Sequence, residues 1–108
     1  MVVGAVDEIF HALADSTRRD ILAAVLQEDH SVSGLARRYP MSFAAVQKHV
    51  AVLEHAGLVT KTRHGREQRV RGDFGALRRA QSLLDELEVL WRGRIDRMDQ
   101  VLGEGPPQ

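Results

Sequence analysis

Two early stretches of the chain place apolar residues at three- and four-residue spacing, the period of an amphipathic helix. The first covers residues 6–13. The second runs from Ser16 to Gln27 and follows Asp15, a residue type that commonly caps helix N-termini. The pattern therefore predicts two helices joined by a short turn.

A short helix and a longer one follow with little chain between them. Ser31 can cap a stretch that ends at Tyr39, because Pro40 disfavours helical geometry at the residue before it. Ser42 can cap the next helix, which closes at Gly57. So tight a connection is a helix-turn-helix pattern, whose second helix can present its N-terminal residues to the major groove of DNA.

The second half of the chain predicts a hairpin and one long helix. β-Branched residues within 58–71 flank a turn at 64–66, which favours two short strands. From Phe74 to Leu102 a near-heptad apolar stripe continues for about 40 Å at ~1.5 Å per residue, longer than this domain needs to cover its core. The surplus apolar face indicates a partner, and a second copy of the chain is the expected one.

These elements predict one mainly α-helical domain over 1–102, a winged helix-turn-helix with a two-stranded β-hairpin wing and a long C-terminal dimerisation helix. We expect residues 103–108, rich in Gly and Pro, to form a flexible tail. Length supports a single domain, since 108 residues lie within the common domain size.

Composition removes several classes of protein. The chain has no cysteine, which excludes disulfides, thiol catalysis and Cys-ligated metal centres. It also lacks a long apolar run and a signal-peptide pattern at its start, so we expect a cytoplasmic protein without a membrane partner. A catalytic function is not expected, because HxxxH, GxSxG and Gly-rich phosphate-loop motifs are missing. The nearby pairs Glu8 with His11 and His64 with Glu67 are interpreted as local ion pairs rather than metal ligands.

Charge is unevenly distributed, although the formal net charge is zero. Residues 60–80 contain seven Lys or Arg against two Asp or Glu, while both ends of the chain are acidic. A basic centre of this kind is typical of a protein with one DNA-binding face, although a solvated basic loop would give the same count.

The segments FHALADSTRRDIL and AVQKHVAVLEHAGLVTKTRHGREQRVR resemble the ArsR/SmtB family of bacterial winged-helix repressors, over nearly the whole chain. The C-terminal LWRGRIDRMDQVL is similar to the SdpR-like branch. The resemblance implies a homodimer that represses transcription by occluding RNA polymerase. The metal-binding motifs common in the family are missing, because Ser33-Gly34-Leu35-Ala36 stands at the usual Cys-x-Cys position and the last helix has no histidine. We therefore expect neither a metal nor another cofactor, and interpret the last helix's carboxylates as a charged face.

Expected DNA contacts come from the recognition helix and the wing. Gln47 suits adenine and Lys48 suits guanine or phosphate, while Phe43 either packs locally or meets a thymine methyl group. For His49 a phosphate contact and a half-buried structural role both stay open. The complete set of predicted DNA-binding residues is Ser42, Phe43, Ala44, Gln47, Lys48, His49, Arg63, His64, Arg66 and Arg69.

Apolar residues of the first and last helices are assigned to the dimer interface or the core: Ile9, Phe10, Leu77, Leu84, Leu87, Trp91 and Ile95. Arg18 and Arg19 either contact the DNA backbone or close a structural ion pair. Lys61 and Arg71 are candidates for pairing with a helix carboxylate.

The predicted function is a metal-independent homodimeric repressor, in the first place of its own gene, that binds a pseudo-palindromic double-stranded DNA operator. Two alternatives stay open. One is a repressor of the same fold that responds to a metal or a small-molecule inducer bound between the first and last helices. The other is a protein-interaction module that docks through the long helix.

Overall fold

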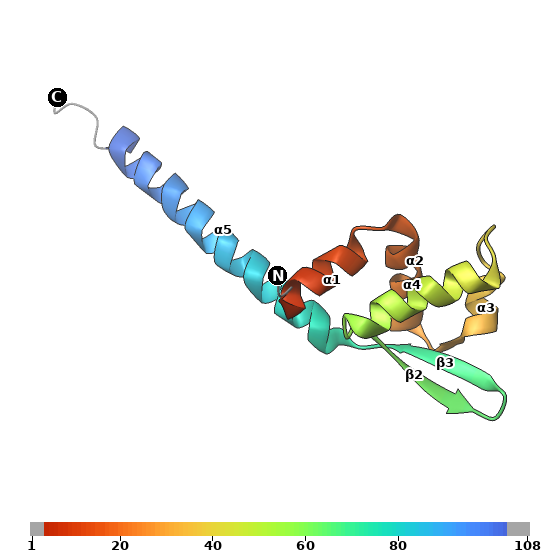
Figure 1. Cartoon of the computed structure of the whole chain (residues 1–108). Coiled ribbons are helices and arrows are strands. Elements are labelled where there is room, and N and C mark those ends of the chain that lie inside the picture. The colour runs from red at the N-terminus through yellow and green to blue at the C-terminus, as the bar shows by residue number, and fades with distance from the viewer. Residues whose placement is uncertain (1–3, 104–108) are drawn as a thin grey trace.

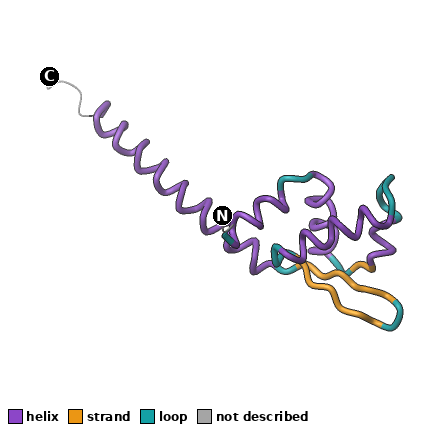
Figure 2. The backbone as a smooth tube through the Cα atoms, viewed as in Figure 1, coloured by secondary structure: helices purple, strands orange, loops and turns teal. Residues whose placement is uncertain are grey.

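The computed structural model describes residues 4–103 and places the expected helices in the expected order (Figure 1). The helices are α1 (Ala5–Leu13), α2 (Ser16–Gln27), α3 (Val32–Ala36), α4 (Phe43–His55) and α5 (Phe74–Gly103). The strands are β1 (His30–Ser31), β2 (Val59–His64) and β3 (Glu67–Gly72). Figure 2 shows the hairpin β2–β3 extending beyond the helices. The predicted winged helix-turn-helix is confirmed.

Side-chain caps start three of the helices where the sequence predicts. Asp15, Ser31 and Ser42 each accept a hydrogen bond from the backbone N–H three residues later, at 3.0, 2.9 and 3.1 Å. Gly57 has φ +78° and ends α4, with its N–H and that of Leu58 bonded back to the last turn. These local signals fix the length of the recognition helix.

Four details differ from the prediction, two in the sheet and two at helix ends. The sheet has three strands in the order β1–β3–β2, because His30 and Ser31 pair antiparallel with Val70 and Arg69. The hairpin turn is tighter than expected, since β2 includes His64 and leaves only Gly65 and Arg66 between the strands.

The remaining differences concern helix ends. The short helix ends at Ala36 instead of reaching Tyr39. At the C-terminus, Gly103 belongs to α5 rather than to a tail, and the rest of the predicted tail lies outside the described residues.

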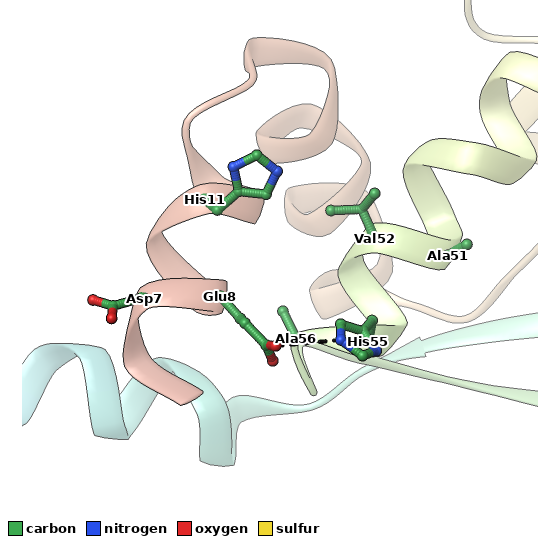
Figure 3. A pocket seen from close by; sticks show the side chains of 7 residues that line it. All are labelled: Asp7, Glu8, His11, Ala51, Val52, His55 and Ala56. Atoms are coloured by element: carbon green, nitrogen blue, oxygen red, sulfur yellow. Dashed lines mark ion pairs between the residues drawn. The ribbon is translucent and has the colours of Figure 1, made fainter. Parts of the chain in front are cut away.

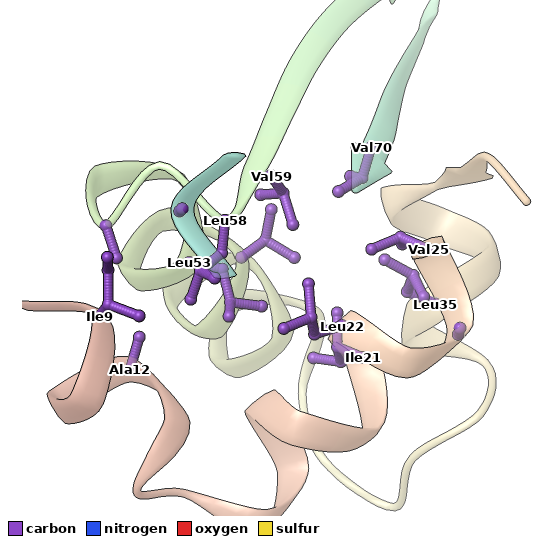
Figure 4. Packing of buried hydrophobic residues seen from close by; sticks show 14 of the residues in the cluster. Ile9, Ala12, Ile21, Leu22, Val25, Leu35, Leu53, Leu58, Val59 and Val70 are labelled. Atoms are coloured by element: carbon purple, nitrogen blue, oxygen red, sulfur yellow. The ribbon is translucent and has the colours of Figure 1, made fainter. Parts of the chain in front are cut away.

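One apolar core unites the helices and the base of the hairpin (Figure 4). Ile9 of α1, Ile21 of α2, Leu53 of α4 and Val70 of β3 are completely buried, and Leu35 of α3 joins them. On α5 only Ala76 and Ala80 are buried, so the core holds just its first turns.

The rest of α5 projects away from the domain (Figure 1). The molecule measures 77 × 30 × 22 Å, and its radius of gyration is 20.3 Å. A compact domain of this length has a radius of gyration of about 13 Å. None of the described helices, α5 included, is long and apolar enough to cross a membrane.

Candidate nucleic-acid interface

Helix α4 separates an inward apolar stripe from an outward polar face. Val46, Val50 and Leu53 are completely buried. The residues predicted to point outward are all exposed, namely Phe43, Ala44, Gln47, Lys48 and Ala51. Ser42 is also exposed at the N-cap, where it bonds to the N–H of Ala45. The first turns of α4 therefore present an amide, an ammonium group and an aromatic ring to solvent.

The connection between α3 and α4 is held against α2. The hydroxyl of Tyr39 donates a hydrogen bond of 2.5 Å to Oδ2 of Asp20. The pKa of Tyr39 is raised to about 12, mainly because the side chain is partly buried and secondly because it donates this hydrogen bond to Asp20. The contact fixes the turn that sets the start of the recognition helix.

The two faces of the wing carry different side chains. Side chains alternate along a strand, so Arg63 shares a face with buried Val59, and its cross-strand partner Gln68 shares that face with buried Val70. This inner face is turned toward the helices, and Lys61 on it pairs with Glu54 of α4 at 3.5 Å. All four predicted wing contacts are exposed: Arg63, His64, Arg66 and Arg69.

A polar cleft of about 260 Å³ lies where the wing faces the helices. It joins α3, the first turns of α4 and the tip of the hairpin, and its lining residues are Val32, Ser33, Phe43, Gln47, Arg63, Arg66, Glu67 and Gln68. The sequence prediction missed Ser33 and Gln68. No linear pattern indicates them, because both reach the cleft through the packing of the wing on α3.

Arg18 is a structural residue. Its Nε and Nη2 donate to the carbonyls of Ala12 and His11 at the end of α1, at 2.8 and 3.0 Å, and Nη1 lies 3.4 Å from Nδ1 of His49. A cation at a helix C-terminus is favourable, because the last carbonyls of a helix have few backbone partners; the carbonyl of His11 also accepts from the N–H of Ala14 at 3.2 Å. The side chain is only 13% exposed, and its carboxylate partner Asp15 lies 3.8 Å away.

His49 and Arg19 also have local partners. His49 is half-buried against Arg18 rather than on the outward face of α4, which favours its structural role. Arg19 donates to the carbonyl of Leu13 at 2.8 Å. The backbone N–H of Arg18 is the main group that lowers the pKa of Asp15. Both arginines thus brace the turn between α1 and α2.

A second concave region lies between α1 and α4 (Figure 3). This groove of about 720 Å³ is mostly apolar at its floor and has Asp7 and His11 at its rim. Across it, Glu8 pairs with Nε2 of His55 at 3.3 Å. The prediction that Glu8 pairs with His11 is therefore wrong, because the carboxylate turns toward α4.

The other predicted ion pairs have mixed outcomes. Lys61 has its helix carboxylate, Glu54, as expected. Arg71 lies 4.0 Å from Asp29, which follows α2 rather than belonging to a helix. Within residues 4–103 no ion pair joins His64 and Glu67, although the two are cross-strand partners.

The apolar residues assigned to the interface or the core differ in how far they are buried. Ile9 is completely buried in the chain's own core and offers no surface to a partner, which corrects its place in the interface set. Phe10 and Leu77 are half-buried against that core. The others, on the projecting part of α5, are 38–56% exposed: Leu84, Leu87, Trp91 and Ile95.

Among the described residues no three His, Asp or Glu side chains gather as a metal site requires. The carboxylates of α5 behave as a charged helix face, and Glu88 for example is engaged by Arg92 at 2.7 Å.

Comparisons with known proteins agree with this geometry. The profile described as "Bacterial regulatory protein, arsR family" matches residues 15–61, from the cap of α2 into β2. The HTH-type transcriptional regulator YuzN of Bacillus subtilis is 41% identical over 70 residues, which cover 58% of this chain and 76% of YuzN.

Two solved structures have the same fold. An ArsR-like transcriptional regulator from Rhodococcus sp. RHA1 is 34% identical, with a TM-score of 0.77 over 89% of this chain and 91% of that one. Mb0332 from Mycobacterium bovis, a homodimeric winged helix-turn-helix DNA-binding domain, is 25% identical, with a TM-score of 0.61 over 82% of this chain and 79% of that one. The chain belongs to the ArsR family of bacterial regulatory proteins and is a winged helix-turn-helix, DNA-binding transcriptional regulator.

Proposed function

We propose that the protein is a homodimeric repressor that binds a pseudo-palindromic operator through α4 and the wing, without sensing a metal. The observation that carries the proposal is the exposed polar face of α4, which lies beside a basic hairpin on the same domain. A fold of this kind places the second helix of the helix-turn-helix in the major groove.

Base recognition is assigned to the first turns of α4. Gln47 can pair with N6 and N7 of adenine, and Lys48 with O6 and N7 of guanine or with a phosphate. Phe43 and Ala44 offer apolar contact to thymine methyl groups, and Ser42 places the N-terminus of α4 at a phosphate. His49, held by Arg18, orients α4 and is not proposed as a base contact.

The wing is assigned to the DNA backbone. Guanidinium groups at Arg63, Arg66 and Arg69 suit bidentate phosphate pairing and insertion into a narrow minor groove, and His64 lies near the tip. A dimer with roughly 6–10 phosphate contacts should lose about 10³–10⁵ in affinity between 50 and 200 mM salt.

Dimerisation is assigned to α5. Beyond the core its apolar stripe includes Trp91, 56% exposed, and Met98, 53% exposed. Soluble monomers rarely leave a contiguous apolar face of this length in water. The homodimeric relative from Mycobacterium bovis supports a second copy of this chain as the partner. A two-fold dimer would place the recognition helices about 34–36 Å apart, on half-sites one helical turn apart.

Selection of bound duplexes from a random pool tests the proposal, followed by transcription from a promoter that carries the selected site. We expect two inverted half-sites and a fall in transcript when the protein is added. Gln47→Ala should relax the preference at one base position per half-site, whereas Gln81→Ala, on an exposed part of α5, should not change it. A pool that shows no enrichment would contradict sequence-specific binding and favour the protein-interaction alternative.

A further inference from the structure

The polar cleft between the wing and α3 contains unused hydrogen-bonding groups. Arg63 and Gln68 reach it from paired positions on the inner face of the hairpin, and Ser33 reaches it from α3. Within residues 4–103 the one hydrogen bond found for these three side chains joins Nε of Arg63 to the carbonyl of Gly65, at 3.3 Å. The remaining donors of the guanidinium, the amide and the hydroxyl are therefore available to a ligand.

The charge of the cleft favours an anion. Two guanidinium groups, from Arg63 and Arg66, line it against the single carboxylate of Glu67. Neither arginine forms an ion pair with Glu67 within the described residues. The guanidinium groups therefore stay free to bind an external oxyanion, for which their planar donors are well suited.

The position of the cleft identifies the anion. Gln47 of the recognition helix lies on one side and the tip of the wing on the other. If α4 lies in the major groove and the wing reaches the adjacent minor groove, as in the proposed function, the strand that separates the two grooves must pass between them. Its phosphates are the nearest anions.

We propose that this cleft is a phosphate-binding site that holds one backbone phosphate of each half-site, with Arg63, Gln68 and Ser33 as its donors. The proposal rests on the proposed function and adds Gln68 and Ser33 to the DNA contacts. It also divides the wing by face, because Arg69 on the outer face contacts other phosphates. The carboxylate of Glu67 repels the bound phosphate, and this repulsion lowers the affinity for DNA of any sequence.

The test uses the full chain and the selected duplex, with single phosphates replaced one at a time by uncharged methylphosphonate. For the wild-type protein we expect one position per half-site, between the bases read by α4 and the adjacent minor groove, where the replacement weakens binding about tenfold. Arg63→Gln should bind the unmodified duplex about tenfold more weakly and be insensitive to the replacement at that position alone. Its log–log salt slope should fall by about one.

Matched variants separate the cleft from the wing as a whole. Gln68→Ala should lose part of the sensitivity at the same position, and Glu67→Gln should strengthen binding to selected and scrambled duplexes alike. Thr62→Ala, on the outer face of β2 beside Arg63, should retain the wild-type pattern. Circular dichroism and the thermal midpoint of each variant confirm folding.

The two proposals fail in different ways. In one outcome the wild-type protein binds the selected duplex, but methylphosphonate replacement weakens the binding of Arg63→Gln at the same positions and to the same extent as it does for wild type. This result would overturn the phosphate site in the cleft and leave the operator-binding function standing. A random pool from which the wild-type protein enriches no duplex would overturn both.

Discussion

Arg18→Met tests whether one side chain braces α1 against the rest of the domain. Methionine keeps the apolar part of the arginine stem and removes every donor. The lost contacts are the bonds of 2.8 and 3.0 Å to the carbonyls of Ala12 and His11 and the 3.4 Å contact to His49. The ion pair with Asp15 is also lost, at a longer 3.8 Å.

The expected cost follows from burial. Hydrogen bonds from charged groups contribute about 1.5–3 kcal/mol each when both partners are shielded. Arg18 is 13% exposed, but one of its two carbonyl contacts lies at the surface and can be rehydrated. The pair with Asp15 adds little, because that carboxylate is open to solvent and the two groups are 3.8 Å apart. We therefore expect Arg18→Met to lower the free energy of unfolding by about 2–3 kcal/mol.

Urea denaturation at fixed protein concentration measures this loss, because association would otherwise shift the midpoint. Arg19→Met is the matched control. That side chain is exposed, and within residues 4–103 its one hydrogen bond goes to the carbonyl of Leu13, so its removal should cost under ~1 kcal/mol. A loss under ~1 kcal/mol for Arg18→Met, no larger than that for Arg19→Met, would refute the bracing role of Arg18.

Three further predictions concern the interface, the sheet and acid stability. Trp91→Glu should convert the proposed dimer to monomers in sedimentation equilibrium, while Val89→Glu, on the opposite side of α5, should leave it intact; if both variants stay dimeric, the assigned face is contradicted. Gly72→Ala should cost about 1–3 kcal/mol in urea denaturation, because a Cβ atom would lie 2.7 Å from Leu26 Cδ2 and 3.1 Å from its Cα, and an unchanged midpoint would show that α2 yields freely. Folding lowers the pKa of Asp15, so its charge stabilises the native state above the unfolded pKa of about 4, and this stabilisation is lost as the pH falls through the lowered folded pKa. Asp15→Asn should therefore be less stable than wild type at pH 7 in thermal unfolding, the gap should narrow as the pH falls below about 4, and a gap that does not narrow in acid would refute this.

Local signals were sufficient for most of the fold. The helix over Ser16–Gln27 has the predicted bounds, because an Asp cap and an apolar stripe both act within a few residues. Strand β1 was missed because two residues are too few to show a period, and His30 becomes a strand only through pairing with β3. The end of the short helix was misplaced because a tertiary contact, Tyr39 to Asp20, replaces its last turn.

Some features of the candidate site could likewise be predicted from local patterns, whereas others depend on tertiary contacts. The apolar stripe of α4 was enough to predict that Gln47 and Lys48 point outward, because helix geometry alone turns them away from the core. The partner of Glu8 and the place of Gln68 depend on contacts between distant segments, and no spacing in the sequence carries them. Assignment to the SdpR-like branch stays a prediction.

Fluorescence anisotropy with a labelled duplex from the region upstream of the gene, beside a scrambled duplex of equal length, tests the central claim most directly. Titrations at 50 and 200 mM salt, with excess chelator and then with zinc, complete the set. The account predicts tight binding to the upstream duplex only, a loss of about 10³–10⁵ in affinity at the higher salt, and no effect of chelator or zinc. Equal, weak binding to both duplexes with no dependence on salt would contradict it.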